Sequence, residues 1–112
     1  MWKVTYPDLI ENLPDAEIPL DGVRGKLLQC ADHQVVFLEI EPIGTVPIHS
    51  HGAQWGIVIE GEMDLTIGVE TRTYRAGDSY YIPAGVEHGA VFRSHFKAID
   101  LFGEPDRYER AR

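Results

Sequence analysis

The sequence contains one cysteine, Cys30, among its 112 residues. No intrachain disulfide can form, and a metal site in this chain must be built mainly from nitrogen and oxygen ligands. Cysteine-rich zinc sites are therefore excluded. A lone cysteine is more often a small buried residue than a reactive thiol, so we predict that Cys30 is buried.

Basic residues are also few: 10 lysines and arginines stand against 18 aspartates and glutamates, and the formal net charge is -8. Such a surface repels phosphate groups, so we expect no nucleic-acid partner and no binding to an anionic membrane surface. No apolar run approaches the roughly 18 residues of a membrane-spanning helix, and the N-terminus lacks the pattern of a signal peptide. We therefore expect a cytoplasmic protein.

Long helical patterns are missing as well. The 11 glycines and 7 prolines interrupt every stretch that could carry a helical hydrophobic period, and no glycine-rich turn opens a helix to bind a nucleotide. Short apolar runs recur roughly every ten residues, which is typical of a β-sandwich or barrel. We predict an all-β fold with strands at residues 34–41, 56–60, 62–67, 70–75, 79–82, 88–92 and 96–101.

One pair of runs predicts a hairpin. Met63, Leu65 and Ile67 alternate with polar residues, as in a strand with one solvent-facing side. Gly68 supplies a turn, and the threonine-containing run 70–75 is the natural partner strand.

The first part of the chain is less regular and contains Pro7, Pro14 and Pro19. We predict one domain over residues 1–112, in which about residues 1–30 form an irregular arm with a strand near residues 26–28.

Histidines carry the clearest functional signal. His49 and His51 are two residues apart in an extended stretch after Pro47, and side chains at this spacing point to the same side of a strand. They are either metal ligands or packed side chains. The amide oxygen of Gln54 is a further candidate ligand, although this residue could instead cap a surface turn. His88 follows a loop that a proline and a glycine make rigid, so its position is well held.

Two stretches around these histidines resemble the two sequence motifs of the cupin family. Residues 44–61 resemble the first motif, a glycine followed by His-x-His, an acidic ligand and a second glycine. Residues 77–88 match the second motif, Gly-x5-Pro-x-Gly-x2-His, at every spacing. The resemblance implies a double-stranded β-helix, or jelly-roll barrel, in which His49, His51 and His88 converge on one divalent transition metal ion. Gln54 stands where the motif has a glutamate.

The first motif departs from the family pattern in two spacings. Four residues separate Gly44 from His49 where the motif has five, and two separate His51 from Gln54 where three or four are usual. We therefore expect the loop around these histidines to be tighter than in the family pattern. Three neutral imidazoles and a neutral amide leave a divalent ion its full charge, and they suit zinc, iron, nickel or copper better than manganese.

Strand alternation predicts which residues line the pocket beside the metal. Phe92 shares a face with the second-motif histidine and should make the pocket less polar. Gly56 shares a face with Gln54, where it either leaves room for a ligand or marks a bulge or close strand packing. Tyr80 and Tyr81 are neighbours, so one of them faces the interior as a hydroxyl donor or a structural residue.

The leading functional hypothesis is a metal-dependent enzyme of the dioxygenase, isomerase or lyase type, acting on a small organic acid, sugar or enol. The alternative is a non-catalytic module that binds or senses a small molecule. Barrels that resemble this one host both, so the fold does not choose between them. No side chain stands out as a general base, and Glu60 and Glu87 are expected to be solvated.

We also expect a homodimer. Small barrels with exposed sheet edges commonly pair, and the resemblance to small cupins implies the same. The candidate contacts are Trp2, Trp55 and the N-terminal arm.

Overall fold

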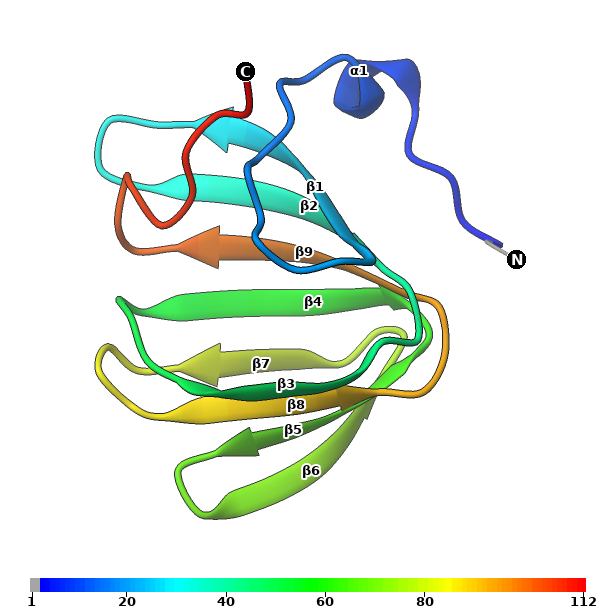
Figure 1. Ribbon diagram of the computed structural model, residues 1–112, viewed down its shortest axis with the longest axis vertical. Coiled ribbons are helices and arrows are strands. Elements are labelled where there is room, and N and C mark those ends of the chain that lie inside the picture. Colours follow the sequence, from blue (N-terminus) through cyan, green and yellow to red (C-terminus); the bar gives the residue numbers. More distant parts are fainter. Residues whose placement is uncertain (1–2) are drawn as a thin grey trace.

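Two antiparallel sheets make up most of the computed structural model, which describes residues 3–112 (Figure 1). The sheets have the strand orders β1-β2-β9-β4-β7 and β3-β8-β5-β6. A short helix, α1 (Asp8–Glu11), precedes the strands, and no helix among the described residues could cross a membrane. The strands are β1 (Val23–Gln29), β2 (Gln34–Ile40), β3 (Gly44–His49), β4 (Gln54–Glu60), β5 (Glu62–Ile67), β6 (Glu70–Arg75), β7 (Ser79–Ile82), β8 (His88–Phe92) and β9 (Phe96–Phe102). The predicted all-β jelly-roll fold is confirmed.

The hydrophobic core lies between the two sheets, because alternate residues of each strand point into the same space. In β2, Val36, Leu38 and Ile40 are buried, and the residues between them are half-buried. The predicted hairpin is present as β5 and β6, which pair along their whole length, and Gly68 turns the chain with a φ of 62°. Of the three residues predicted to share one face of this hairpin, Met63 and Leu65 are buried in the core and Ile67 is half-buried.

The irregular N-terminal part is shorter than predicted. β1 extends well beyond residues 26–28 and pairs along its whole length with β2. It begins directly after Gly22, whose φ of 83° favours glycine. Trp2, a predicted interface residue, lies outside the described residues.

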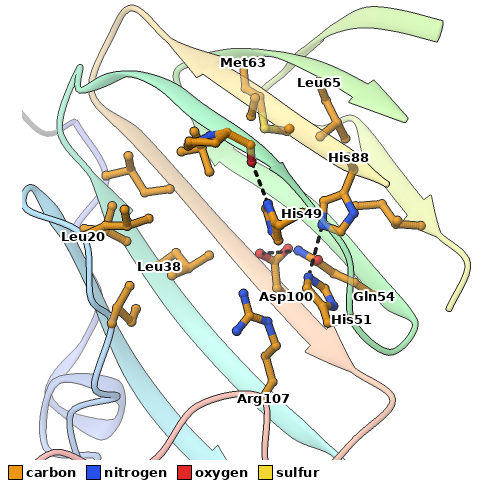
Figure 2. A pocket seen from close by; sticks show the side chains of 18 of the residues that line it. Leu20, Leu38, His49, His51, Gln54, Met63, Leu65, His88, Asp100 and Arg107 are labelled. Carbon is orange, nitrogen blue, oxygen red and sulfur yellow. Dashed lines mark hydrogen bonds between the residues drawn. The ribbon is translucent and has the colours of Figure 1, made fainter. Parts of the chain in front are cut away.

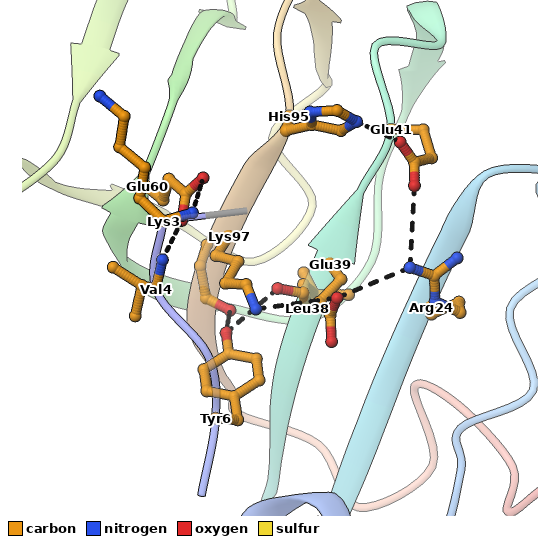
Figure 3. Close-up of polar contacts among 11 residues, drawn as sticks. Lys3, Val4, Tyr6, Arg24, Leu38, Glu39, Glu41, Glu60, His95 and Lys97 are labelled. Carbon is orange, nitrogen blue, oxygen red and sulfur yellow. Dashed lines mark hydrogen bonds and ion pairs between the residues drawn. The ribbon is translucent and has the colours of Figure 1, made fainter. Parts of the chain in front are cut away.

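The N-terminal segment packs against the outer face of the five-stranded sheet (Figure 3). Tyr6 is buried, and its hydroxyl donates to the carbonyl oxygens of Leu38 and Ala98 at 3.1 and 3.3 Å. The ammonium group of Lys97 lies 4.5 Å from the centroid of the Tyr6 ring and 3.7 Å from the carboxylate of Glu39. These contacts attach the segment to β2 and β9.

The prediction that Cys30 is buried is wrong. This residue directly follows β1, in the turn that leads to β2, and its side chain is exposed. A residue in a turn at the end of the sheet has no core to face, whatever its hydrophobicity.

Candidate metal centre

The three predicted histidine ligands come from two neighbouring strands and a loop. His49 ends β3 and pairs with His88, which begins β8. The register between these strands shifts between Val46 and His49, and such a β-bulge redirects the side chains that follow it. His51 lies beyond the end of β3. The loop, rather than a strand face shared with His49 as predicted, therefore brings His51 to the site.

The loop that carries His51 is held by hydrogen bonds on two sides. The backbone N–H of Gly85, in the second motif, donates to the carbonyl oxygen of His51 at 2.9 Å. The N–H of Gly52 donates to the carboxylate of Glu104, and a side chain at residue 52 would collide with that carboxylate. The position of His51 thus depends on segments far from it in the sequence.

The imidazole rings of His49, His51 and His88 form a cluster at one end of a cavity (Figure 2). The ring centroid of His49 is 5.4 Å from that of His51 and 4.3 Å from that of His88, and the last two are 4.7 Å apart. One nitrogen of each ring lies within 4.8 Å of the other two. The three nitrogens can therefore bind the same ion.

Hydrogen bonds determine which nitrogen of each ring faces the centre of the cluster. Each Nδ1 lies 2.9, 2.9 or 3.0 Å from a backbone carbonyl oxygen, and these oxygens belong to Pro47, Gly52 and Val86. A carbonyl oxygen can only accept, so each neutral ring carries its proton on Nδ1 and a lone pair on Nε2. The Nε2 atoms of His51 and His88 are only 3.1 Å apart. Two lone pairs at this distance repel each other unless a cation lies beside them, so the cluster fits a metal ion.

Burial keeps two of these rings uncharged near neutral pH. Desolvation, with smaller effects from Arg107 and the neighbouring rings, lowers the pKa of His51 to about 4, although its hydrogen bond to Gly52 opposes the shift. Desolvation also lowers the pKa of His88. Neutral imidazole is the form that binds a metal, so protons compete weakly for these ligands at pH 7. Imidazole nitrogens suit zinc, iron, nickel and copper.

Gln54, the predicted fourth ligand, begins β4 and lines the same cavity. Its amide nitrogen donates to the carboxylate of Asp100 at 3.3 Å, so this residue does not cap a surface turn. The amide oxygen is the atom that remains to face a metal.

Asp100 is a candidate functional residue that neither motif contains. It is 2% exposed, lies in β9, and accepts a hydrogen bond of 2.5 Å from the Tyr80 hydroxyl. Burial raises the pKa of its carboxyl group to about 7, against the effect of the hydrogen bonds from Tyr80 and Gln54. Among the described residues that line the cavity, it is the only carboxylate. The signal in the sequence is an aspartate at an inward position of a strand whose other inward residues are apolar, namely Phe96, Ala98 and Phe102.

Arg107, in the segment after β9, is a second residue outside the motifs. Its guanidinium group points into the cavity (Figure 2), and its positive charge contributes to the lowered pKa of His51. The guanidinium carbon lies 4.4 Å from the centroid of the Tyr108 ring, and the Nε atom is buried without a hydrogen-bond partner. An unpaired buried N–H is destabilising, and a guanidinium group binds carboxylates through paired hydrogen bonds. Arg107 therefore fits an anionic group of a ligand.

A model of the cupin domain family matches residues 36–102. The chain belongs to the cupin family. This cupin is 38% identical over 72 residues to the H2HPP isomerase of Bacillus subtilis, and the match covers 62% of the chain but only 30% of that relative. The structure of KdgF from Halomonas sp. is similar, with a TM-score of 0.72, 27% identity, and coverage of 83% of this chain and 87% of the other. An RmlC-like cupin from Shewanella frigidimarina has a TM-score of 0.74, 27% identity, and coverage of 86% and 87%.

Two of the four predicted pocket residues, Tyr80 and Phe92, line the cavity of this cupin. Phe92 is four residues along β8 from the histidine cluster, roughly 13 Å away, so it lines the far end rather than the surroundings of the metal. The prediction for Tyr81 is corrected: side chains alternate along β7, and Tyr81 faces outward and is exposed. Gly56 leaves no room for a ligand, because a Cβ atom there would collide with the carboxylate of Asp100 and the hydroxyl of Tyr80.

Proposed function

We propose that this cupin is a metal-dependent enzyme of the isomerase or lyase type that moves a proton within a small carboxylate substrate. One observation carries the proposal: the histidine cluster, the carboxyl group of Asp100 and the guanidinium group of Arg107, whose Nε has no hydrogen-bond partner, line the same cavity. A metal site, an acid-base group and an anion-binding group are the components that such a reaction requires.

Each component has one role in the proposed reaction. A metal ion at the cluster would polarise a carbonyl or enol oxygen of the substrate and so acidify the adjacent C–H bond. Arg107 binds the substrate carboxylate. Asp100 accepts the proton as the C–H bond breaks, and the electron pair moves toward the carbonyl oxygen. Return of the proton to a different carbon completes an isomerisation, and loss of a leaving group instead gives a lyase reaction.

The position of Asp100 supports its role as the proton carrier. The Tyr80 hydroxyl and the Gln54 amide both donate to its carboxylate and orient it. Burial brings the pKa of the carboxyl group to about 7, where it can both accept and return a proton. The Bacillus subtilis relative is named an isomerase, which agrees with a proton-transfer reaction, although the chain spans only 30% of that protein.

Solvent exchange tests the proposal. Metal-loaded protein in deuterated buffer should catalyse deuterium incorporation next to the carbonyl group of small 2-oxo acids, measured by proton NMR. Asp100→Asn should lower the exchange rate by about 100-fold or more with the metal retained, since general acid-base catalysis contributes that much. Arg107→Met should weaken substrate binding.

Two results would contradict this assignment. Unchanged exchange in Asp100→Asn would exclude Asp100 as the proton carrier. Metal-dependent binding without exchange, turnover or oxygen uptake would favour the non-catalytic binding module, and oxygen uptake would favour a dioxygenase.

We also infer that two copies of the chain pair through the outer face of the five-stranded sheet. A row of apolar side chains crosses all five strands, in the paired order Leu28, Val35, Leu101, Trp55 and Tyr81. All of them except Val35 are between 40% and 58% exposed. On a chain of net charge -8 this row is uncharged and complementary to itself, as a two-fold symmetric contact requires.

A further inference from the structure

The cavity extends well beyond the histidine cluster, and its far end is apolar. Its volume is about 460 Å³, within the range of small-molecule sites. Figure 2 shows His49, Asp100 and Arg107 grouped together, with Leu20 and Leu38 on one side of this group and Met63 on another. The histidine cluster, Asp100 and Arg107 therefore lie together in one part of the cavity, and its far end is lined by apolar side chains.

Strand register gives the length of the apolar end. Past His88, β8 points Ala90 and then Phe92 into the cavity, and β5 places Leu65 and Met63 directly beside them. At about 3.3 Å per residue, this wall continues for roughly 13 Å beyond His88. A chain or ring of several carbon atoms can lie along it.

The opposite wall is apolar too. β2 contributes Leu38 and Ile40, β9 contributes Phe96, and the segment before β1 contributes Ile18 and Leu20. The described side chains of this end are aliphatic, thioether or aromatic, and the strand backbones are paired within the sheets. A hydroxyl group placed here loses its hydrogen bonds to water without replacement, which lowers affinity about tenfold or more. Each buried methylene group raises affinity about threefold to fourfold.

We propose that the substrate of this cupin is an amphipathic acid with an apolar chain or ring, rather than a polyhydroxylated sugar acid. Its carboxylate lies at Arg107, and its apolar part lies against Leu65, Met63 and Phe92. The proposal rests on the proposed function for the position of the carboxylate, and it adds the chemical class of the remainder of the molecule.

Calorimetric titration of the zinc-loaded protein with straight-chain 2-oxo acids, from pyruvate to 2-oxooctanoate, tests this proposal. Kd should fall about threefold to fourfold for each added methylene group until the apolar end is full. A matched pair with the same number of carbon atoms, 2-oxohexanoate and 2-oxogluconate, should differ by about 100-fold or more in favour of the apolar acid, since 2-oxogluconate carries hydroxyl groups in place of hydrogen atoms along its chain.

A substitution that fills part of the cavity with a larger side chain tests the same proposal independently. Val46 lines the cavity and pairs with Ala90, one inward position past the histidine cluster. Val46→Phe should weaken 2-oxooctanoate about tenfold or more and leave pyruvate nearly unaffected, because only the longer acid reaches this position. The matched control is Val69→Phe, since Val69 is fully exposed in the β5–β6 turn and should change neither Kd.

The contrary results separate the two proposals. Pyruvate binding with a flat chain-length profile, or equal affinity for 2-oxogluconate and 2-oxohexanoate, would overturn the apolar substrate class and leave the proposed function intact. Failure of every 2-oxo acid, including pyruvate, to bind the zinc-loaded protein would contradict the proposed function itself.

Discussion

At the scale of single residues, the burial of Asp100 lowers the stability of the folded chain. A carboxyl group with 2% exposure gives up nearly all of its contact with water, and two hydrogen bonds compensate only in part. Because desolvation outweighs these hydrogen bonds, the pKa of the carboxyl group is raised to about 7. The folded chain binds a proton at Asp100 over a pH range in which the unfolded chain, with an ordinary pKa of about 3.9, does not.

The sign of the resulting pH dependence follows directly. Because the folded state holds the extra proton, the contribution of Asp100 to the free energy of unfolding decreases as pH rises from about 4 to about 7. Asp100→Asn removes this decrease. We expect the free energy of unfolding of the variant, relative to that of the parent, to increase by about 2 kcal/mol between pH 5 and pH 8. Urea unfolding of the metal-free proteins measures this difference. Asp32→Asn, at an exposed position, is the control and should show no such change. A difference that stays constant with pH for Asp100→Asn would contradict the burial of a charged group.

The histidine ligands could be predicted from the sequence, whereas Asp100 could not. His49, His51 and His88 could be predicted because each lies in a short motif whose spacing is visible in the chain. Asp100 and Arg107 lie beyond both motifs, and they reach the site only because β9 pairs beside β4 and the chain then turns back over the cavity. Pairing between distant strands cannot be read from local spacing.

At the scale of elements, the site depends on irregular features of regular strands. β3 was not among the predicted strands because Pro47 interrupts its pattern, and an edge strand tolerates a proline there. The bulge next to Pro47 directs His49 toward His88. The loop that follows then needs its own support, which Glu104 and Gly85 supply through hydrogen bonds to it.

This support predicts an effect of Glu104 on metal affinity. Glu104→Ala removes the acceptor of the Gly52 N–H and should weaken zinc binding about tenfold, since partners that orient ligands contribute about this much. Competition with a chromophoric chelator measures the change. Glu87→Ala, an exposed glutamate in the loop before His88, is the matched control and should bind zinc like the parent. Equal affinity for both variants would show that the loop holds His51 without Glu104.

At the scale of the whole molecule, charged and apolar side chains occupy different parts of the surface. The chain carries a net charge of -8, yet the row from Leu28 to Tyr81 across the outer sheet is uncharged, and the cavity presents the arginine Arg107. The sequence indicated the excess of acidic residues, but not this distribution, because only the strand register aligns residues from five separate strands.

The apolar row predicts the oligomeric state. Light scattering during size-exclusion chromatography should give a mass of about twice 12.6 kDa for the parent protein. Trp55→Glu should shift the protein to monomers, since it places a charge in the centre of the row. Val69→Glu adds the same charge on the other sheet and should remain dimeric. A monomeric parent would contradict the proposed interface.

The metal content of the purified protein tests the central claim most directly. Plasma mass spectrometry of untagged protein, as purified and after reconstitution, should find about one equivalent of zinc, iron, nickel, copper or manganese. His49→Ala and His88→Ala should each lose it, whereas His33→Ala, an exposed histidine in the turn before β2, should keep it. Absence of metal from the parent after reconstitution, or equal content in all variants, would contradict a metal centre built from His49, His51 and His88.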